Sequence, residues 1–160
     1  MDFRLRGFGG FTPVSALRDG IAAVPDLGGV YAVLRVDDGP PRFLGRNPGS
    51  HFNRKDPTVP MERLKKEWVD GAQTLYIGSA RNLRDRIGRL IEFSDAGTDN
   101  SVFHWGGRLL WQVATSDEFE IVWKTLPPDQ IRMLEQELVD EFVDGWGRMP
   151  FANLKRPTGR

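Results

Sequence analysis

One carboxylate of this sequence lies where a helix should be apolar. At 100° per residue, residues 130–144 form an apolar helix face, and Glu135 falls inside it, about 40° from Ile131. An ionised carboxylate on such a face loses hydration unless a cation or hydrogen-bond donors replace the water. Two interpretations follow. Glu135 forms a buried salt bridge or reaches solvent from the edge of the face, or it binds a metal ion at the floor of a cleft.

A second charged side chain borders an apolar face on another expected helix. In residues 83–93, Arg86 falls beside Leu90 on the shoulder of the face that should pack in the core. A guanidinium held at that place is ordered in advance, which suits it to binding an anion at a fixed position. The alternative is an arginine whose stem covers the core edge while its head stays in water.

The composition excludes several other kinds of site. The chain has 160 residues, no cysteine and two histidines, so a thiolate nucleophile, a disulfide framework and a metal site of several cysteines or histidines cannot form. No apolar run reaches the length of a transmembrane helix, and the N-terminus lacks the apolar core of a signal peptide. We therefore expect a single cytoplasmic domain over residues 1–160 that does not interact with membranes.

Charge is balanced over the chain but segregated along it. There are 22 Lys and Arg and 22 Asp and Glu, which gives a formal net charge of zero. Basic residues gather in 42–66, 81–89 and 148–160, and acidic residues gather in 117–144. If the basic segments meet in space, they form a phosphate-attracting face backed by an acidic one. The alternative is chance clustering of surface charges.

Apolar periodicity and turn residues predict the elements that position these side chains. Helices are expected over residues 13–23 with Thr12 as N-cap, 60–69, 83–93 with Asn82 as N-cap, and 128–144. Strands are expected over residues 28–36, 41–46, 74–78 and 119–123, the first two paired as a hairpin. This order predicts an α/β or α+β fold with a small mixed or antiparallel central sheet flanked by helices.

Four segments, taken in order, resemble the GIY-YIG nuclease superfamily. Gly29-Val30-Tyr31 and Tyr76-Ile77-Gly78 are similar to the two strand motifs, and the second continues as LYIGSARNLRDRIGRL into a helix that carries Arg86. LEQELV (134–139) resembles the segment with the family's metal-binding glutamate, and PFAN (150–153) resembles the closing P-x-x-N element. The resemblance covers about residues 28–153, and its glutamate coincides with the residue that the helical pattern singles out.

The resemblance implies an endonuclease that hydrolyses phosphodiester bonds in DNA by in-line attack of water, in repair, restriction or phage defence. Tyr76 would match the general base, and Tyr31 would lie beside it to orient the water and the scissile phosphate. Arg86 would bind a phosphate oxygen. Glu135 would hold one Mg²⁺ or Mn²⁺, with water and the substrate phosphate completing the shell. Asn153 would match the terminal asparagine of the site. Ordinary strand packing is the alternative for the tyrosines.

The sequence departs from the family pattern at three places. Leu90 stands where many relatives carry a His or Tyr, and Ser79 stands where many carry Lys. His104, in the segment FHWGGR, is the candidate to replace the missing proton-transferring group, or it is a loop residue without a chemical role. The connection of about residues 37–73 between the two motifs is long, and it is either a substrate-binding or a packing insertion.

Further substrate contacts are expected from residues near the motifs and in the insertion. These are Gly78, Ser79, Arg81, Arg108, Arg54 and Lys55. Asn53 and Thr58 could line the cleft mouth, and Trp105 and Trp111 could stack on bases or pack in the core. Residues 154–160 would form a basic tail. The chain could act alone, as a homodimer or with a specificity partner. A nucleic-acid-binding module without turnover and an RNA-directed nuclease remain alternatives.

Overall fold

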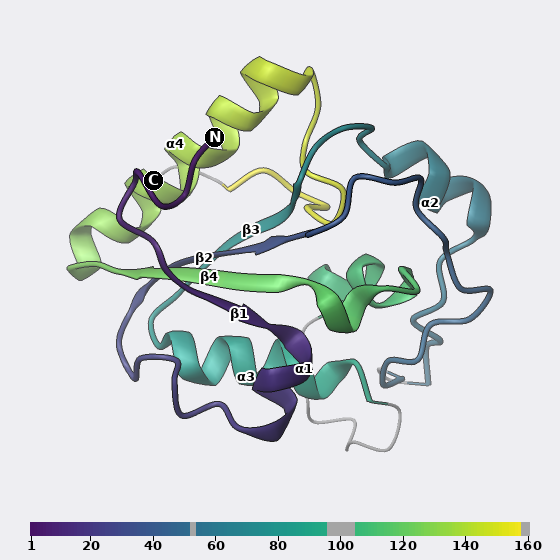
Figure 1. Cartoon of the computed structure of the whole chain (residues 1–160), viewed down its shortest axis with the longest axis horizontal. Helices are drawn as coiled ribbons and strands as arrows, with labels where there is room; N and C mark the ends of the chain where they lie inside the picture. Colours follow the sequence, from purple (N-terminus) through teal and green to yellow (C-terminus); the bar gives the residue numbers. More distant parts are fainter. Residues whose placement is uncertain (52–53, 96–104, 158–160) are drawn as a thin grey trace.

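The computed structural model describes residues 1–51, 54–95 and 105–157, and it is built around one four-stranded sheet (Figure 1). The strands are β1 (Gly9–Pro13), β2 (Gly29–Leu34), β3 (Thr74–Ala80) and β4 (Glu120–Thr125). They lie in the order β1-β4-β2-β3, and every neighbouring pair is antiparallel. The predicted α+β class is confirmed, and of the two expected sheet types the antiparallel one is observed.

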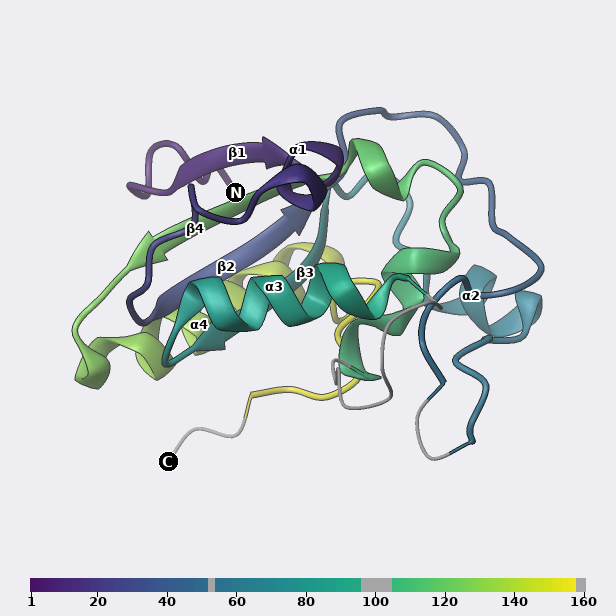
Figure 2. The same ribbon diagram turned by 90° about the horizontal axis from the view of Figure 1, so that it is seen from below.

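Helices cover both faces of this sheet (Figures 1 and 2). On one face lie α1 (Val14–Asp19), α3 (Leu83–Phe93) and the 3₁₀ segments η1 (Trp105–Gln112) and η2 (Ser116–Glu118), and α2 (Met61–Glu67) packs at the end of this layer. On the other face lies α4 (Pro128–Trp146). Each face therefore has its own apolar core. No helix in the described ranges is both long enough and apolar enough to cross a membrane.

Local signals set the bounds of the two helices that carry the charged side chains. The side chain of Asn82 accepts a hydrogen bond of 3.0 Å from the backbone N–H of Asp85, as its predicted capping role requires. Helix α4 begins at Pro128 and ends at Trp146. It is followed by the C-cap Gly147, whose φ of 74° is left-handed and whose N–H donates to the carbonyl of Val143. The helix runs two residues beyond the predicted end at residue 144.

The N-terminal prediction was wrong in two respects. Thr12 and Pro13 belong to β1, a strand that the sequence did not suggest, and α1 ends at Asp19 rather than near residue 23. Strand β1 contains glycine and proline, and its pairing with β4 is irregular. Gly10 has a φ of 92°, and a Cβ there would lie 2.7 Å from the ring of Trp123. Pairing with a distant strand, rather than local propensity, therefore sets this conformation.

The expected hairpin strand over residues 41–46 is also wrong. Its only bridge in the described residues joins Phe43 to Val113, at the end of η1. The N–H of Leu44 donates to the carbonyl of Gln112, and the carbonyl of Arg42 accepts from the N–H of Ala114. The segment therefore pairs with the end of η1 instead of β2, because β2 already has β4 and β3 as neighbours. The expected strand over 28–36 is shorter, and that over 74–78 extends to Ala80.

A buried amide fastens the insertion between β2 and β3 to η1. Gln112 is fully buried, and its Oε1 accepts a hydrogen bond of 2.7 Å from the N–H of Val59. Its Nε2 donates to the carbonyls of Leu44 at 3.0 Å and Val59 at 2.9 Å. The side chain of Asn47 donates to the carbonyl of Arg108 at 2.8 Å. The side-chain amides of Gln112 and Asn47 therefore hold the insertion against η1, where regular strand pairing is absent from the described residues.

Candidate active site

The two tyrosines of the chain lie side by side over one glycine. Tyr31 on β2 is paired in register with Gly78 on β3, and Tyr76 precedes Gly78 by two residues on the same face. The ring centroids are 5.9 Å apart. A Cβ on Gly78 would lie 2.8 Å from a ring carbon of Tyr76 and 2.9 Å from the hydroxyl oxygen of Tyr31. The absence of a side chain at Gly78 therefore creates the space in which the two phenols meet.

Arg86 joins the tyrosine pair from helix α3. The two phenols hydrogen-bond to each other, and the half-buried guanidinium of Arg86 hydrogen-bonds to both. The stem of Arg86 lies beside the buried face of α3, where Leu83, Ile87 and Leu90 are fully buried. This is the position on the helix shoulder that the sequence indicated. The structure thus brings a fixed positive charge to the phenol oxygens.

The surroundings of the two phenols affect their pKa values differently. Burial raises the pKa of Tyr31 well above its usual range, and the neighbouring Tyr76 raises it further. Burial also raises the pKa of Tyr76, whereas the charge of Arg86 and the hydrogen bond from Tyr31 lower it. Both phenols are therefore protonated at neutral pH. Arg86 favours the ionised form of both phenols, and the hydrogen bond from Tyr31 favours that of Tyr76 in addition.

Glu135 reaches the same edge of the sheet from the opposite face. It belongs to α4, and its Oε2 accepts a hydrogen bond of 2.7 Å from the hydroxyl of Ser79, the residue after Gly78. The carboxylate raises the pKa of Tyr76, so the two groups are near enough to interact. Burial raises the pKa of Glu135 itself, while the Ser79 hydrogen bond and the charge of Arg132 lower it.

Asn153 closes the outer edge of β3. Its Oδ1 accepts from the backbone N–H of Ile77 at 2.9 Å, and its Nδ2 donates to the carbonyl of Ile77 at 2.8 Å. The N–H of Ala152 donates to the carbonyl of Leu75 at 2.9 Å. The Asn153 side chain thus pairs with the strand as a neighbouring backbone would. It is a positioning residue for Tyr76 and Gly78, with both ends of its amide engaged by the strand.

The carboxylate of Glu135 suits one class of metal ion. Within residues 1–51, 54–95 and 105–157, no cluster of three or more His, Cys, Asp or Glu side chains could hold a metal. In the same ranges, Oε1 of Glu135 accepts no hydrogen bond, whereas Oε2 is oriented by Ser79. Mg²⁺ and Mn²⁺ bind at sites with one carboxylate, where waters and substrate phosphates complete the shell. Glu135 fits such an ion.

The other predicted substrate contacts are spread over the molecule. Arg81 and Ser79 line a cavity at the C-terminal end of β3. Arg108 lies half-buried on η1, where burial and the charge of Arg63 lower its pKa. Arg54 and Lys55 are exposed before α2, and no hydrogen bond or ion pair within the described residues joins them to the phenols.

The remaining predictions concern side chains that have another role in the structure or lie outside the described residues. Trp111 is 1% exposed and packs in the core, so base stacking by this residue is excluded. The hydroxyl of Thr58 accepts from the N–H of Asn47 and serves the insertion instead of a cleft mouth. His104 and Asn53 lie outside the described residues, as does the side chain of Trp105. Arg132, which also lines the cavity, was missed because an exposed arginine on a helix carries no sequence signal.

Comparison with protein-family models, curated proteins and solved structures finds no match for this chain. The side chains that meet at β3 are therefore what indicates a function. Two phenols, a guanidinium and a half-buried carboxylate come from β2, β3, α3 and α4, and a serine and a glycine complete the arrangement. Groups with perturbed pKa values gathered in this way are typical of catalytic sites.

Proposed function

We propose that the chain is a Mg²⁺- or Mn²⁺-dependent endonuclease of the GIY-YIG type that hydrolyses phosphodiester bonds in DNA. The observation that supports this most strongly is the meeting of Tyr31, Tyr76, Arg86 and Glu135 at the outer edge of β3. The first and the last of these residues, Tyr31 and Glu135, are more than 100 residues apart in the sequence. Each of the four lies in a segment that resembles one of the family's motifs. Core packing alone does not require a cation and a carboxylate beside two buried phenols.

Arg86, Tyr76 and Tyr31 have different roles around the scissile phosphate. Arg86 binds a non-bridging oxygen and offsets the negative charge that grows on phosphorus. Tyr76 orients the attacking water through its hydroxyl, and it accepts a proton from that water only in its phenolate form, which nearby positive charge favours by lowering its pKa. Tyr31 hydrogen-bonds to Tyr76 and favours that ionised form. The water oxygen bonds to phosphorus and the bond to the 3′ oxygen breaks. The 3′ oxygen takes a proton from solvent, which leaves a 5′ phosphate and a 3′ hydroxyl.

Glu135 is the protein ligand for the divalent ion. Ser79 fixes one carboxylate oxygen, Oε2, and the other oxygen would be left for the ion. When bound, the ion supplies Lewis-acid stabilisation of the phosphate and of the leaving 3′ oxygen. Asn153 acts only through the strand that carries Tyr76.

Cleavage of plasmid and oligonucleotide DNA with Mg²⁺ or Mn²⁺ tests this proposal. Arg86→Ala and Glu135→Gln should each lower the rate by about a hundredfold or more while the fold persists. Arg89→Ala, at a surface position on the same helix that pairs with Asp85, and Asp144→Asn, an exposed acid on α4, are matched controls. A chelator should abolish cleavage. Wild-type rates in the Arg86 or Glu135 variant would remove that residue from the mechanism.

A second candidate function is a nucleic-acid-binding module of the same fold without turnover. Leu90 favours it, because this fully buried side chain offers no proton-transferring group where many GIY-YIG enzymes have one. Binding without cleavage in either metal, unchanged by Glu135→Ala, would support the module. RNA and DNA substrates compared side by side would decide between the two nucleic acids. If the basic segments contact phosphates, binding should weaken steeply as salt rises.

A further inference from the structure

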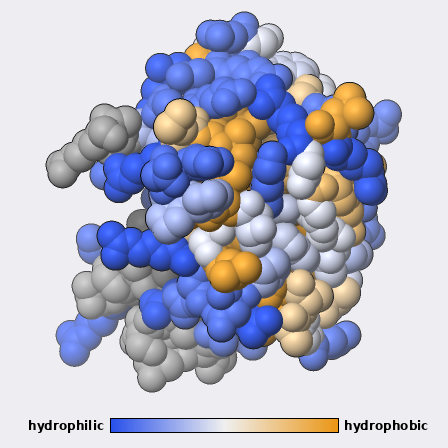
Figure 3. Space-filling model, turned by 90° about the vertical axis from the view of Figure 1, so that its left-hand side faces the viewer, coloured by the Kyte–Doolittle hydropathy of each residue, from blue (hydrophilic) through white to orange (hydrophobic). Residues whose placement is uncertain are grey.

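A cavity of about 860 Å³ opens beside the proposed active site, at the end of the molecule where α3 and α4 begin. Its walls come from three separate parts of the chain: residues 27–28, residues 79–81, and residues 125–128 with 131–132. Figure 3 faces this end of the molecule and shows apolar surface set between hydrophilic side chains. The cavity has the size of a small-ligand site.

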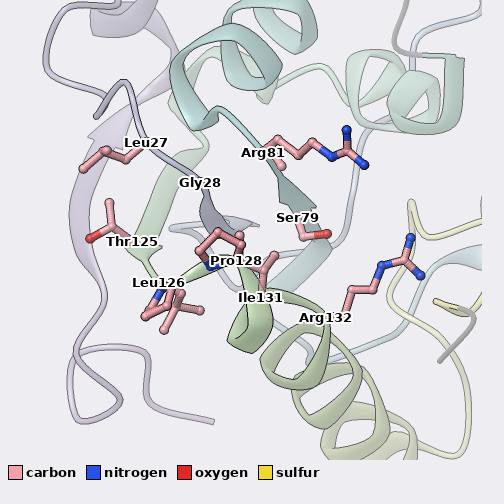
Figure 4. Close-up of a pocket in the computed structure, with 11 residues that line it drawn as sticks. Leu27, Gly28, Ser79, Arg81, Thr125, Leu126, Pro128, Ile131 and Arg132 are labelled. Carbon is pink, nitrogen blue, oxygen red and sulfur yellow. The ribbon is translucent and has the colours of Figure 1, made fainter. Parts of the chain in front are cut away.

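The lining is apolar on one side and basic on the other. Leu27, Leu126 and Ile131 form the apolar part, together with the prolines at the start of α4. Arg81 and Arg132 flank the other part, and Figure 4 shows both guanidinium groups extending to the same side as the hydroxyl of Ser79. A ligand that fills the cavity therefore meets apolar side chains at one end and two positive charges at the other.

Ser79 connects this cavity to the proposed active site. Its side chain lines the cavity, and its hydroxyl donates to Oε2 of Glu135. The charge of Arg132 acts on the same carboxylate. A group held between Arg81 and Arg132 would therefore lie next to the phosphate that Arg86 and Glu135 bind. The position of the cavity suits the nucleotide that neighbours the scissile bond.

We propose that this cavity binds one unpaired nucleotide of the DNA substrate, with its base against Leu27, Leu126 and Ile131 and its phosphate between Arg81 and Arg132. The inference rests on the proposed nuclease function and specifies the substrate class. A base stacked in a duplex cannot enter a cavity, and removing it costs a few kcal/mol, least where it is mismatched or single-stranded. The preferred substrate is therefore DNA with an unpaired nucleotide next to the cleavage position.

Binding of small ligands without metal tests the cavity independently of cleavage. The probes are a deoxynucleoside 5′-monophosphate, deoxyribose 5-phosphate and inorganic phosphate, measured by ligand-observed NMR in the presence of a chelator. The nucleotide should bind about tenfold or more tightly than the sugar phosphate, because the base removes apolar surface of the cavity from water. Equal binding of the three probes would overturn the proposal.

Variants identify the cavity as the place of binding. Thr125→Trp fills the cavity from an exposed position at the end of β4, and Arg132→Ala removes one cation. Each should weaken nucleotide binding about tenfold, and Arg132→Lys should restore part of the loss because it keeps the charge. Met133→Ala, at an exposed neighbouring position outside the cavity, should bind like the wild type. Wild-type nucleotide binding by both Thr125→Trp and Arg132→Ala would overturn the proposal.

Cleavage of matched DNA substrates separates this inference from the proposed function. A fully paired duplex is compared with the same duplex carrying one unpaired nucleotide, and with one that has an abasic residue in its place. The unpaired substrate should be cut about tenfold or more quickly than the other two, and Thr125→Trp should remove the difference. Cleavage without this preference overturns the inference and leaves the nuclease. Nucleotide binding in the cavity with no cleavage of any DNA overturns the nuclease and leaves a nucleotide site.

Discussion

Gln112 and Tyr31 are both fully buried polar side chains, but burial has different consequences for them. The amide of Gln112 carries no charge, and backbone groups of Leu44 and Val59 take up its donor and acceptor positions. Tyr31 hydrogen-bonds to Tyr76, which is ionisable, and to Arg86, which is positively charged. Burial raises the pKa of Tyr31. The region around Gln112 gains stability from satisfied hydrogen bonds, whereas the region around Tyr31 keeps ionisable groups out of water.

This difference separates a region built for stability from one suited to chemistry. A satisfied neutral amide has one protonation state near neutral pH, so it contributes the same free energy of folding over a wide pH range. Desolvated phenols and a desolvated carboxylate respond to a nearby cation or anion, which is the property that a catalytic group needs. Variants in the two regions should therefore differ in stability, in pH dependence and in activity.

Removal of the buried amide should have the largest effect on stability. Gln112→Ala leaves the N–H of Val59 and the carbonyl of Leu44 without partners and opens a cavity, which should lower the free energy of unfolding by about 3 kcal/mol. Denaturant titration measures the change, with the exposed Gln130→Ala as control. A loss as small as that of the control would show that the amide does not hold the insertion.

Removal of the Asn153 amide should have a smaller effect. Asn153→Ala breaks two hydrogen bonds to Ile77 at a half-buried sheet edge, which should lower the free energy of unfolding by about 1 to 2 kcal/mol. Hydrogen exchange at the N–H of Ile77 should become faster than at Ala32 in the central strand. Unchanged protection at Ile77 would contradict the positioning role.

The phenols offer a direct measurement of the site, because the chain has no other tyrosine. Their pKa values are raised, so phenolate absorbance in the near ultraviolet should appear only above the pH of about 10 at which free tyrosine ionises. Arg86→Ala removes a charge that lowers both pKa values, and it should move the titration to still higher pH. Arg89→Ala is the control. Titration at the pH of free tyrosine would contradict burial of the pair.

The smallest effect is expected for a change that removes the buried charge. Burial raises the pKa of Glu135 in the folded protein, so above that pKa its ionised form favours the unfolded state. Glu135→Gln keeps an acceptor for Ser79, and it should raise the Tm at pH 8 by about 1 to 3 °C. This gain should shrink as falling pH protonates the wild-type carboxyl. A Tm of Glu135→Gln below that of the wild type at every pH, while Asp144→Asn keeps the wild-type Tm, would contradict the expected stabilisation.

Local and periodic signals in the sequence predicted much of the candidate site. The cap at Asn82 and the paired prolines before α4 set helix bounds, and those bounds made the place of Glu135 in the apolar face visible. The family resemblance implied that Tyr31 lies beside Tyr76, and the pairing of Tyr31 with Gly78 provides for it, although residues 28–36 were expected to pair with 41–46. These features depend on short stretches of chain, or on one pair of strands.

Features that depend on distant segments were not predicted. Strand β1 has glycine and proline in place of strand-forming residues, and it forms by pairing with β4 more than 100 residues later. The role of Gln112 depends on the path of an irregular insertion. The cavity beside Ser79 is formed by three separate segments, none of which has a recognisable pattern by itself.

The turn that follows α4 has a consequence for the behaviour of the protein in solution. Strand β3 is at the outside of the sheet, and a strand in that position can recruit a strand from another molecule and so start aggregation. Ala152 and Asn153 occupy the backbone groups of Leu75 and Ile77 that such a strand would need. Removing residues 150–153 would therefore expose backbone groups that can pair with another molecule, and it would also take the buried side chains of Phe151 and Ala152 out of the core.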